Sequence, residues 1–350
     1  MDRLTVLALN SGSSSLKFGV YGVGATDVTV LLSGEIEAQS VDDAGRAVAE
    51  VAERLARANL PTLDSVGHRV VHGGSQLRRH CLIDDTMIGQ LEAATAFAPL
   101  HIPPVLSIIR FSRERFRGLP QVACFDTVFH VGMPEVARTL PIPRNLRIQG
   151  IERYGFHGLS CESIVRQLGT GVPDRLVIAH LGNGASITAV KAGRSIDTSM
   201  GLTPTGGVIM GTRSGDLDPG ILVYLAREKG FDAAMLEEMV DRKSGLWGIS
   251  GIASDMRVLR KASSSNVDAH LAISMFCYSV RKQIAAMIAA LEGVDRIIFT
   301  GGIGEHDALA RAEICVGLSW VDVRVSVLPS QEDKQIARHA RTLIVQRQTT

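Results

Sequence analysis

The chain has 350 residues, a formal net charge of +1 and 45% hydrophobic residues, which is typical of a globular protein with enough apolar material for two compact lobes. Because there is no basic excess, we expect no nucleic-acid partner. No apolar stretch is long enough to span a bilayer, and the first residues lack the basic and apolar regions of a signal peptide, so we expect no membrane partner. The five scattered cysteines include no C-x-x-C pair, which predicts reduced thiols and a cytoplasmic protein.

Two distant segments show the same pattern of hydrophobicity. Residues 4–10 form an apolar run of strand length, a serine-rich turn follows, and residues 16–23 alternate as a returning strand. Residues 176–193 repeat the order of strand, glycine-bearing polar turn and alternating strand. The recurrence predicts that the chain carries two versions of one α/β unit.

Later segments predict the helices and strands between and after these hairpins. Apolar and alanine residues at helical spacing predict a helix over residues 43–60 and a second over residues 268–292, with Asp268 as its capping residue. Because the second helix is mostly apolar on all sides, we expect it to be buried beneath a sheet. Residues 294–300 are typical of a buried strand that runs into a glycine turn.

The C-terminal tail is predicted to be an amphipathic helix. Ser330 and Asp333 have the spacing of a capping box. Apolar residues then follow on one stripe: Ile336, Ala340, Leu343 and Ile344. We place the lobe boundary in the hydrophilic segment near Gly150, which gives lobes at 1–150 and 151–329 and a helix at 330–350 that packs back on the N-terminal lobe.

The first turn carries groups suited to phosphate. Residues 10–15 offer hydroxyls, a side-chain amide and successive backbone N–H groups, a combination that suits phosphate oxygens and Mg²⁺ waters, and Lys17 adds a positive charge. It is not a Walker A loop, because the Gly-Lys-Ser/Thr ending and the following helix are missing. A serine-rich turn is more often simply solvated, so the loop alone decides nothing.

Residues 68–74 place two histidines four residues apart, a spacing that on a helix would indicate a metal pair. Two β-branched residues and a glycine pair instead predict a strand that enters a turn. We therefore favour Arg69, which lies between the histidines, because its planar guanidinium can hold a carboxylate or phosphate bidentately.

Four further polar residues stand in settings that allow catalysis. Asp126 lies within an apolar run, where it is costly unless it orients a catalytic group or forms a structural bridge to an arginine, and the pattern leaves both open. His157 and His180 each lie beside glycines, although most such histidines are packing or surface residues. Arg213 is framed by glycines in a polar loop, a setting in which a guanidinium can reach a transferring phosphoryl group.

Nine segments in this order resemble the acetate kinase (acetokinase) family of the acetate and sugar kinase, Hsp70 and actin superfamily. They are LNSGSSSLKF, GHRVVHGG, CFDTVFH, RYGFHG, HLGNGASI, MGTRSGDLDPG, SGLWGISG, SDMR and FTGGIGE. The resemblance implies an α/β chain of two lobes with duplicated RNase H-like (actin-like ATPase) fold and an active-site cleft between them. It further implies ATP or ADP and a small carboxylate as substrates, Mg²⁺ or Mn²⁺ as cofactor, and a homodimer.

The resemblance also implies a role for individual residues. Asn10 and Glu332 would hold the metal, and Lys17 would lie near nucleotide phosphate. The catalytic residues would be Asp126, His157, His180, Arg213 and Arg69, with the two arginines clamping the carboxylate and the transferring phosphoryl group. The nucleotide would contact Lys17, His180, Leu181, Gly182, Asn183, Gly184, Asp255, Met256, Arg257, Gly302, Ile303, Gly304, Glu305 and His306. The carboxylate would contact Arg69, and its alkyl end would meet Val71, Leu100, Phe156 and Pro204.

Elementary chemistry refines one of these roles. A carboxylate is already a nucleophile at neutral pH, so no proton must be removed from it. We therefore expect Asp126 to orient an arginine or a Mg²⁺ water rather than to act as a general base.

Three departures from the family pattern leave alternatives open. Residues 101–105 carry apolar residues where the family has asparagines, residues 203–207 lack the usual bulky apolar and acidic pair after the proline, and residues 317–329 are much shorter than usual. A propionate or butyrate kinase therefore remains an alternative, as does a nucleotide-binding relative that has lost efficient transfer. A sugar kinase fits less well, because paired arginines suit an anionic acceptor.

Overall fold

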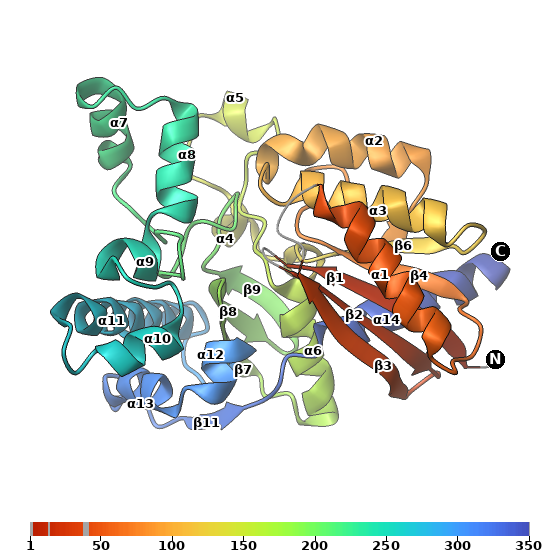
Figure 1. Ribbon diagram of the computed structural model, residues 1–350. Helices are drawn as coiled ribbons and strands as arrows, with labels where there is room; N and C mark the ends of the chain where they lie inside the picture. Colours follow the sequence, from red (N-terminus) through yellow and green to blue (C-terminus); the bar gives the residue numbers. More distant parts are fainter. Residues whose placement is uncertain (1–2, 13–14, 38–41, 350) are drawn as a thin grey trace. The chain divides into compact units, whose positions relative to one another are not determined.

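The computed structural model describes residues 3–12, 15–37 and 42–349 (Figure 1). The chain divides into two compact units. The first comprises Met1–Val131, Gly158–Ser163 and Gln331–Thr350, and the second comprises Gly132–His157 and Ile164–Ser330. Within the described residues, no helix combines the length and apolar character that a membrane crossing requires.

The first unit is built on a six-stranded mixed sheet. Its strands are β1 (Leu4–Ser11), β2 (Ser15–Val23), β3 (Val28–Glu37), β4 (Ser65–Val70), β5 (Cys81–Leu82) and β6 (Gln121–Phe125). They lie in the order β3-β2-β1-β4-β6-β5, with β1, β2 and β3 antiparallel and β4 and β6 parallel to β1. Leu4 pairs with Val23 and Ser11 with Leu16, so the predicted N-terminal hairpin is confirmed.

Helices cover both faces of this sheet (Figure 1). The helical segments are α1 (Asp43–Arg57), α2 (Asp85–Ala93), η1 (Ala94–Phe97), α3 (Ile102–Arg115), η2 (Val128–His130) and α14 (Glu332–Thr349). Helix α1 and helix α3 pack on one face, against residues such as Leu7 and Val66. Helix α14 packs on the other face through the predicted stripe, including Ile336 and Ala340. A methyl group on Gly67 would lie 2.6 Å from Ile336 Cγ2, so only glycine lets α14 approach β4 this closely.

The second unit repeats the topology of the first. Its strands are β7 (Arg175–Leu181), β8 (Ala185–Lys191), β9 (Arg194–Thr198), β10 (Arg296–Thr300) and β11 (Arg324–Val327), in the order β11-β10-β7-β8-β9. Strands β7, β8 and β9 are antiparallel, and β10 and β11 run parallel to β7. This order matches β6-β4-β1-β2-β3, so the duplication predicted from the two hairpins is confirmed, as is the duplicated RNase H-like fold that the family resemblance implies.

The helices that belong wholly to the second unit are short, with one exception. They are α4 (Glu135–Arg138), α5 (Arg144–Arg147), η3 (Gly169–Gly171), α7 (Pro219–Glu228), α8 (Ala233–Arg242), α9 (Gly245–Ser250), α10 (Met256–Ala262), α11 (Val267–Ala290), α12 (Gly301–His306) and α13 (Ala308–Val316). Helix α6 (Gly158–Leu168) runs from the first unit into the second. The glycine turn expected after β10 is the first turn of α12.

The long helix α11 corrects two expectations. Its cap is Asn266, whose side chain accepts a hydrogen bond from the amide of Ala269, and Asp268 lies in the first turn instead. The helix packs against the sheet with one side only. Its other side exposes an apolar stripe at helical spacing: Val267, Leu271, Met275 and Tyr278. Hydrophobicity on all sides therefore does not mean burial within the single chain.

Candidate functional site

Strand alternation brings three polar residues of the first unit to one face of the sheet. Asn10 follows Val6 and Ala8 at spacings of two, Arg69 follows Gly67, and Asp126 continues the alternation of β6. Successive side chains of a strand point to opposite faces, so all three project toward the face that α14 covers. This is why residues far apart in the sequence meet here.

Arg69 and Asp126 form a nearly enclosed ion pair. Arg69 Nε lies 3.0 Å from Oδ1 and 3.1 Å from Oδ2 of Asp126, and Arg69 Nη2 lies 2.6 Å from Oδ2. The side chains are 14% and 1% exposed respectively. Burial raises the pKa of Asp126, and the charge and hydrogen bonds of Arg69 act in the opposite direction. A carboxylate that accepts these bonds from a permanently charged guanidinium is ionised at neutral pH.

The ion pair with Asp126 determines which N–H donors of Arg69 remain available to a ligand. Asp126 takes the side of the guanidinium formed by Nε and Nη2, and Nη1 donates to Asn10 Oδ1 at 3.2 Å. A guanidinium has five N–H donors, so one hydrogen on each terminal nitrogen remains. Arg69 can therefore donate to an anion while Asp126 fixes its orientation.

The first turn of α14 adds two carboxylates to the same place. Asn10 Nδ2 donates to Glu332 Oε2 at 3.1 Å and to Asp333 Oδ1 at 2.7 Å. Burial raises the pKa of Asp333, and the neighbouring Glu332 adds to that effect, while the Asn10 bond opposes it. Carboxylate oxygens are the ligands that Mg²⁺ prefers, so Glu332 and Asp333 fit the expected cation, whereas the Oδ1 of Asn10 faces Arg69.

Lys17 lies beside this cluster. It is directly opposite Asn10 in the β1–β2 ladder, and its charge lowers the pKa of Asp333 against the larger effect of burial. Its side chain is exposed and is therefore accessible to a phosphate group. Ser13 and Ser14 of the predicted phosphate loop lie outside the described residues.

The two histidines of residues 68–74 have separate partners. His68 is fully buried in β4 with Nε2 2.7 Å from Gln121 Oε1, and burial lowers its pKa to about 4. His72 follows the strand, and its Nδ1 accepts the amide of Gly74 at 2.8 Å. The strand geometry is as predicted, and nothing in these contacts pairs the two rings around a cation.

In the second unit, two histidine rings stack near an arginine. The rings of His157 and His180 lie 4.2 Å apart at 21°, and His157 Nδ1 is 3.0 Å from Ser186 Oγ. A methyl group on Gly184 would lie 3.1 Å from His157 Nε2 and 3.3 Å from Arg213 Nη1. Glycine at this position therefore leaves open a small space that an imidazole and a guanidinium both face.

The loop that carries Arg213 is held from several sides. Arg213 Nη1 donates to the carbonyl of Pro204 at 3.1 Å, and the backbone of Met210 bonds to that of Arg213 at 3.1 Å. The amide of Leu246 at the start of α9 donates to Met210 O at 2.9 Å. These contacts fix the position of the guanidinium before any substrate arrives, which is the condition for electrostatic catalysis.

The three segments expected to contact nucleotide lie together. A methyl group on Gly301 would be 2.7 Å from Leu181 O, so the turn after β7 abuts the start of α12. A methyl group on Gly211 would be 2.5 Å from Asn183 Oδ1 and 3.4 Å from Ser254 O. Ser254, the residue before Asp255, therefore lies close to the turn after β7. Gly182, Asn183 and Gly184 leave β7 at its carboxyl end, where open α/β sheets bind their ligands.

Several side chains in those segments are already committed. Leu181 and Met256 are buried in the core, so only their backbone can meet a ligand. Arg257 is folded on Asp255, with Nη2 2.6 Å from Oδ2. Glu305 Oε1 accepts the amides of Gly301 and Ser330, each at 2.9 Å. The carboxylate of Glu305 thus shapes the glycine turn, in which Gly302 and His306 are exposed, Ile303 is half-buried and Gly304 is buried.

The residues expected to form the alkyl pocket are divided between the units. Val71 and Leu100 belong to the first unit, and Phe156 and Pro204 to the second. Phe156 and Pro204 are buried, whereas Val71 and Leu100 are partly exposed. Ile102, one of the apolar replacements in residues 101–105, is the first residue of α3 and is fully buried in the core, so this departure serves packing.

Two functional candidates were not predicted from the sequence. Asp333 was interpreted as half of a capping box, yet it accepts a hydrogen bond from Asn10. Its position next to Glu332 was the available signal, since carboxylate oxygens are the ligands that hard cations take. Ser186 contacts His157, and strand alternation after the glycine turn could have placed it on the same face as the histidines.

Comparison with known proteins finds relatives that match almost the whole chain. The model of the Acetokinase family matches residues 47–349. An acetate kinase of Geobacillus kaustophilus is 38% identical over 390 aligned residues, covering 97% of this chain and 98% of the relative. The crystal structure of an acetate kinase of Porphyromonas gingivalis has a TM-score of 0.83 and 31% identity, covering 97% of this chain and 100% of that one. A propionate kinase of Francisella tularensis has a TM-score of 0.84 and 33% identity with the same coverage.

Proposed function

Because this chain belongs to the acetokinase family, we propose that it catalyses the reversible, ATP-dependent and Mg²⁺-dependent phosphorylation of acetate to acetyl phosphate. The observation that carries the proposal is the anchored guanidinium of Arg69, which Asp126 orients so that two N–H groups remain for an anionic acceptor. A neutral sugar hydroxyl carries no negative charge that such a guanidinium could pair with.

In the proposed reaction an acetate oxygen attacks the γ-phosphorus of ATP in line with the leaving group. A bond forms between this oxygen and phosphorus as the bond to the β-phosphate oxygen breaks, and ADP leaves. The transferring group is metaphosphate-like, so the protein mainly aligns the reactants and stabilises charge. We assign that stabilisation to Arg213, His180 and His157, and alignment of the acetate to Arg69.

Asp126 acts through Arg69 in this scheme. Its carboxylate already accepts three close contacts from the guanidinium, and acetate has no proton to give up. We therefore assign it an orienting role rather than general base catalysis. The segments from His180 to Gly184, from Asp255 to Arg257 and from Gly302 to His306 would receive the nucleotide.

Asn10 and Glu332 would hold the Mg²⁺, and Asp333 joins them in this proposal. When bound, Mg²⁺ neutralises phosphate charge. Lys17, opposite Asn10, would add a second positive charge near the phosphates.

Removal of either carboxylate should raise the metal requirement. We expect Glu332→Gln and Asp333→Asn each to raise the Mg²⁺ concentration for half-maximal activity by roughly tenfold or more, because each removes a charged oxygen donor. Titration of activity with Mg²⁺, together with Mn²⁺ binding followed by electron paramagnetic resonance, measures this. Glu53→Gln, an exposed change on α1, is the control. Unchanged metal affinity in both variants would remove these residues from the metal site.

A second candidate function is propionate phosphorylation. It is favoured by the similarity to the Francisella tularensis propionate kinase and by the altered residues 203–207. Discrimination of one methylene is worth only about 1–3 kcal/mol, so one pocket can serve several acids.

Trapping of acyl phosphate as hydroxamate, with ATP and Mg²⁺ and with acetate, propionate, butyrate or glycerol, tests the function. We expect acetate to give the highest kcat/KM, and glycerol, which has no carboxyl group and forms no hydroxamate, is the blank. A higher kcat/KM for propionate would transfer the assignment to that acid. Bound ATP without acyl phosphate from any acid would indicate a relative that has lost transfer.

We further propose that the enzyme is a homodimer. The exposed stripe of α11 is 79% exposed at Val267 and 58% at Tyr278, more apolar area than one helix normally leaves to water. A second copy that covers this stripe would explain why α11 is apolar on its exposed side as well as on its buried side. Light scattering should give about twice the 37.5 kDa of one chain, and Leu271→Glu should give a monomer. Val316→Glu on α13 is the control, and a monomeric native chain would refute the proposal.

A cytoplasmic location is proposed from the thiols. All five cysteines are free in the structure and three of them are buried, which suits a reducing compartment. Fractionation of cells with an antibody to the chain tests it, and recovery outside the cytoplasm would contradict it.

A further inference from the structure

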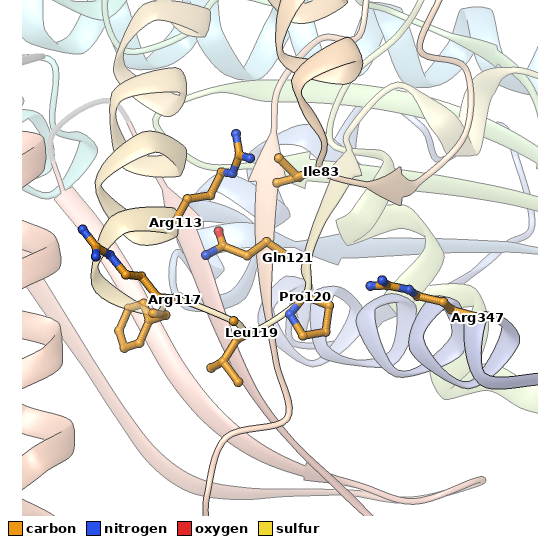
Figure 2. A pocket seen from close by; sticks show the side chains of 9 residues that line it. Ile83, Arg113, Arg117, Leu119, Pro120, Gln121 and Arg347 are labelled. Atoms are coloured by element: carbon orange, nitrogen blue, oxygen red, sulfur yellow. The ribbon is translucent and has the colours of Figure 1, made fainter.

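Arg260 is a partly buried arginine of α10 to which the proposed reaction gives no role. Its side chain is 23% exposed and faces two carboxylates. Arg117 and Arg347, by contrast, are exposed beside a pocket at the start of β6 and are solvated, as surface arginines usually are (Figure 2). A guanidinium that is withdrawn from water needs partners, so the partners of Arg260 indicate what it holds.

The guanidinium of Arg260 is bound mainly to Asp307. Its Nε donates to Asp307 Oδ2 at 3.2 Å, and its Nη1 lies 3.6 Å from Glu313 Oε2 on α13. Its Nη2 is buried and has no partner among the described residues. The side chain of Asp307 is 17% exposed, so this charge-assisted hydrogen bond is shielded from water better than a surface ion pair is.

Asp307 is the junction between α12 and α13. Its Oδ1 accepts the amide of Ala310 at 2.8 Å and thereby caps α13. Its own amide donates to Ile303 O at 2.9 Å and closes the last turn of α12. The two carboxylate oxygens therefore have separate partners, because Oδ1 caps α13 while Oδ2 binds Arg260. A contact that fixes Asp307 also fixes the end of α12.

The ion pair between Arg260 and Asp307 joins two of the segments that the proposed function assigns to the nucleotide. Residues 255–257 form the start of α10, and Arg260 lies one helical turn further on. Residues 302–306 lie in α12, and Asp307 follows directly. Helices α10 and α13 each pack against α11, and Arg260 connects α10 directly to the end of α12.

We propose that Arg260 is a positioning residue for the nucleotide, which sets the spacing between residues 255–257 and 302–306 through its bond to Asp307. This inference rests on the proposed function. The residues assigned to acetate and to the transferring group lie outside α10 and α12. Loss of Arg260 should therefore weaken nucleotide binding and leave turnover largely intact, because a preformed site avoids the cost of ordering these segments around the ligand.

Arg260→Gln removes the charge and keeps much of the side-chain length. We expect it to raise the Kd for ADP and the KM for ATP by about tenfold, because the nucleotide must then order the two segments itself. The kcat at saturating ATP and the KM for acetate should change by less than about twofold. Binding of a fluorescent nucleotide to the full chain, and kinetics by hydroxamate formation, measure these quantities. Lys261→Gln, an exposed change at the next residue of α10, is the control and should behave as wild type does.

Asp307→Asn tests the partner without removing the helix cap, since asparagine caps helices about as well as aspartate does. It should weaken nucleotide binding as Arg260→Gln does, and the double variant should be no worse than either single variant. Arg260→Lys should recover part of the affinity, because it restores the charge without the planar fork. If Arg260→Gln does not fold, Asp307→Asn and Arg260→Lys still decide the question.

A purely structural role for Arg260 predicts different results. A lower Tm with unchanged nucleotide Kd, equal rises in the KM values for ATP and acetate, or effects of the two single variants that multiply in the double variant would each overturn the inference. The proposed function is decided separately, by hydroxamate formation in the wild-type chain, whereas this inference is decided by the change in nucleotide Kd between wild type and the variants.

Discussion

Alanine in place of Arg213 is expected to lower kcat by roughly a thousandfold and to leave ATP binding nearly unchanged. Arg213 is held by the carbonyl of Pro204 and faces the space beside Gly184 that His157 also faces. A positioned cation of this kind stabilises charge that develops only in the transition state, so its loss appears in turnover. Steady-state kinetics with acetate and ATP, and equilibrium binding of a fluorescent nucleotide, measure the two quantities separately.

The matched control for this prediction is Arg242→Ala. Arg242 is an exposed arginine in the last turn of α8, in the same unit, and its removal should change neither quantity. Arg213→Lys should recover only part of the rate, because an ammonium group lacks the planar fork. If Arg213→Ala raised KM for ATP and kept kcat, Arg213 would be a nucleotide-binding residue and the proposed charge stabilisation would be wrong.

The fold could be predicted from the sequence because apolar strand-length runs, polar turns and returning strands recur in the same order. This order in residues 4–23 and 176–193 predicted both hairpins, and its recurrence indicated the duplication that the two sheets show. The same alternation places Asn10, Arg69 and Asp126 on one face, although no sequence spacing connects them. The family resemblance supplied the candidate residues, and the topology explains how three of them come together.

Features that depend on contacts between residues far apart in the chain, or with a second copy of the chain, could not be predicted. Whether Asp126 forms a structural bridge or orients a catalytic group was open, and the structure shows that the bridge is to Arg69 itself, so one contact can serve both purposes. The carboxylate of Glu305 bonds to two backbone amides, a contact set by the folded turn and invisible in the sequence. The exposed side of α11 was not predicted, because hydrophobic composition does not distinguish burial within one chain from burial against a second copy.

A double-mutant cycle on Arg69 and Asp126 should show that the two residues act as one. We expect Arg69→Ala to lower kcat/KM for acetate by about 10³-fold, Asp126→Ala to have a similar effect, and the double variant to be no worse than Arg69→Ala. The reason is that Asp126 contacts the reaction only through the guanidinium that it orients. Arg69→Ala should also lower the free energy of unfolding by about 3–5 kcal/mol, because Asp126 would be left buried and unpaired.

The cycle separates orientation from base catalysis. A general base would contribute independently of Arg69, so the effects of the two single variants would multiply in the double variant. Arg175 and Asp295 are the control, an exposed pair with Nη2 2.6 Å from Oδ1, whose double removal should leave kcat unchanged. In Arg69→Ala the buried carboxyl of Asp126 should have a pKa above its unfolded value, since burial then acts unopposed. The stability of that variant should accordingly fall as pH rises through this pKa, whereas Arg69→Ala/Asp126→Ala should show no such fall.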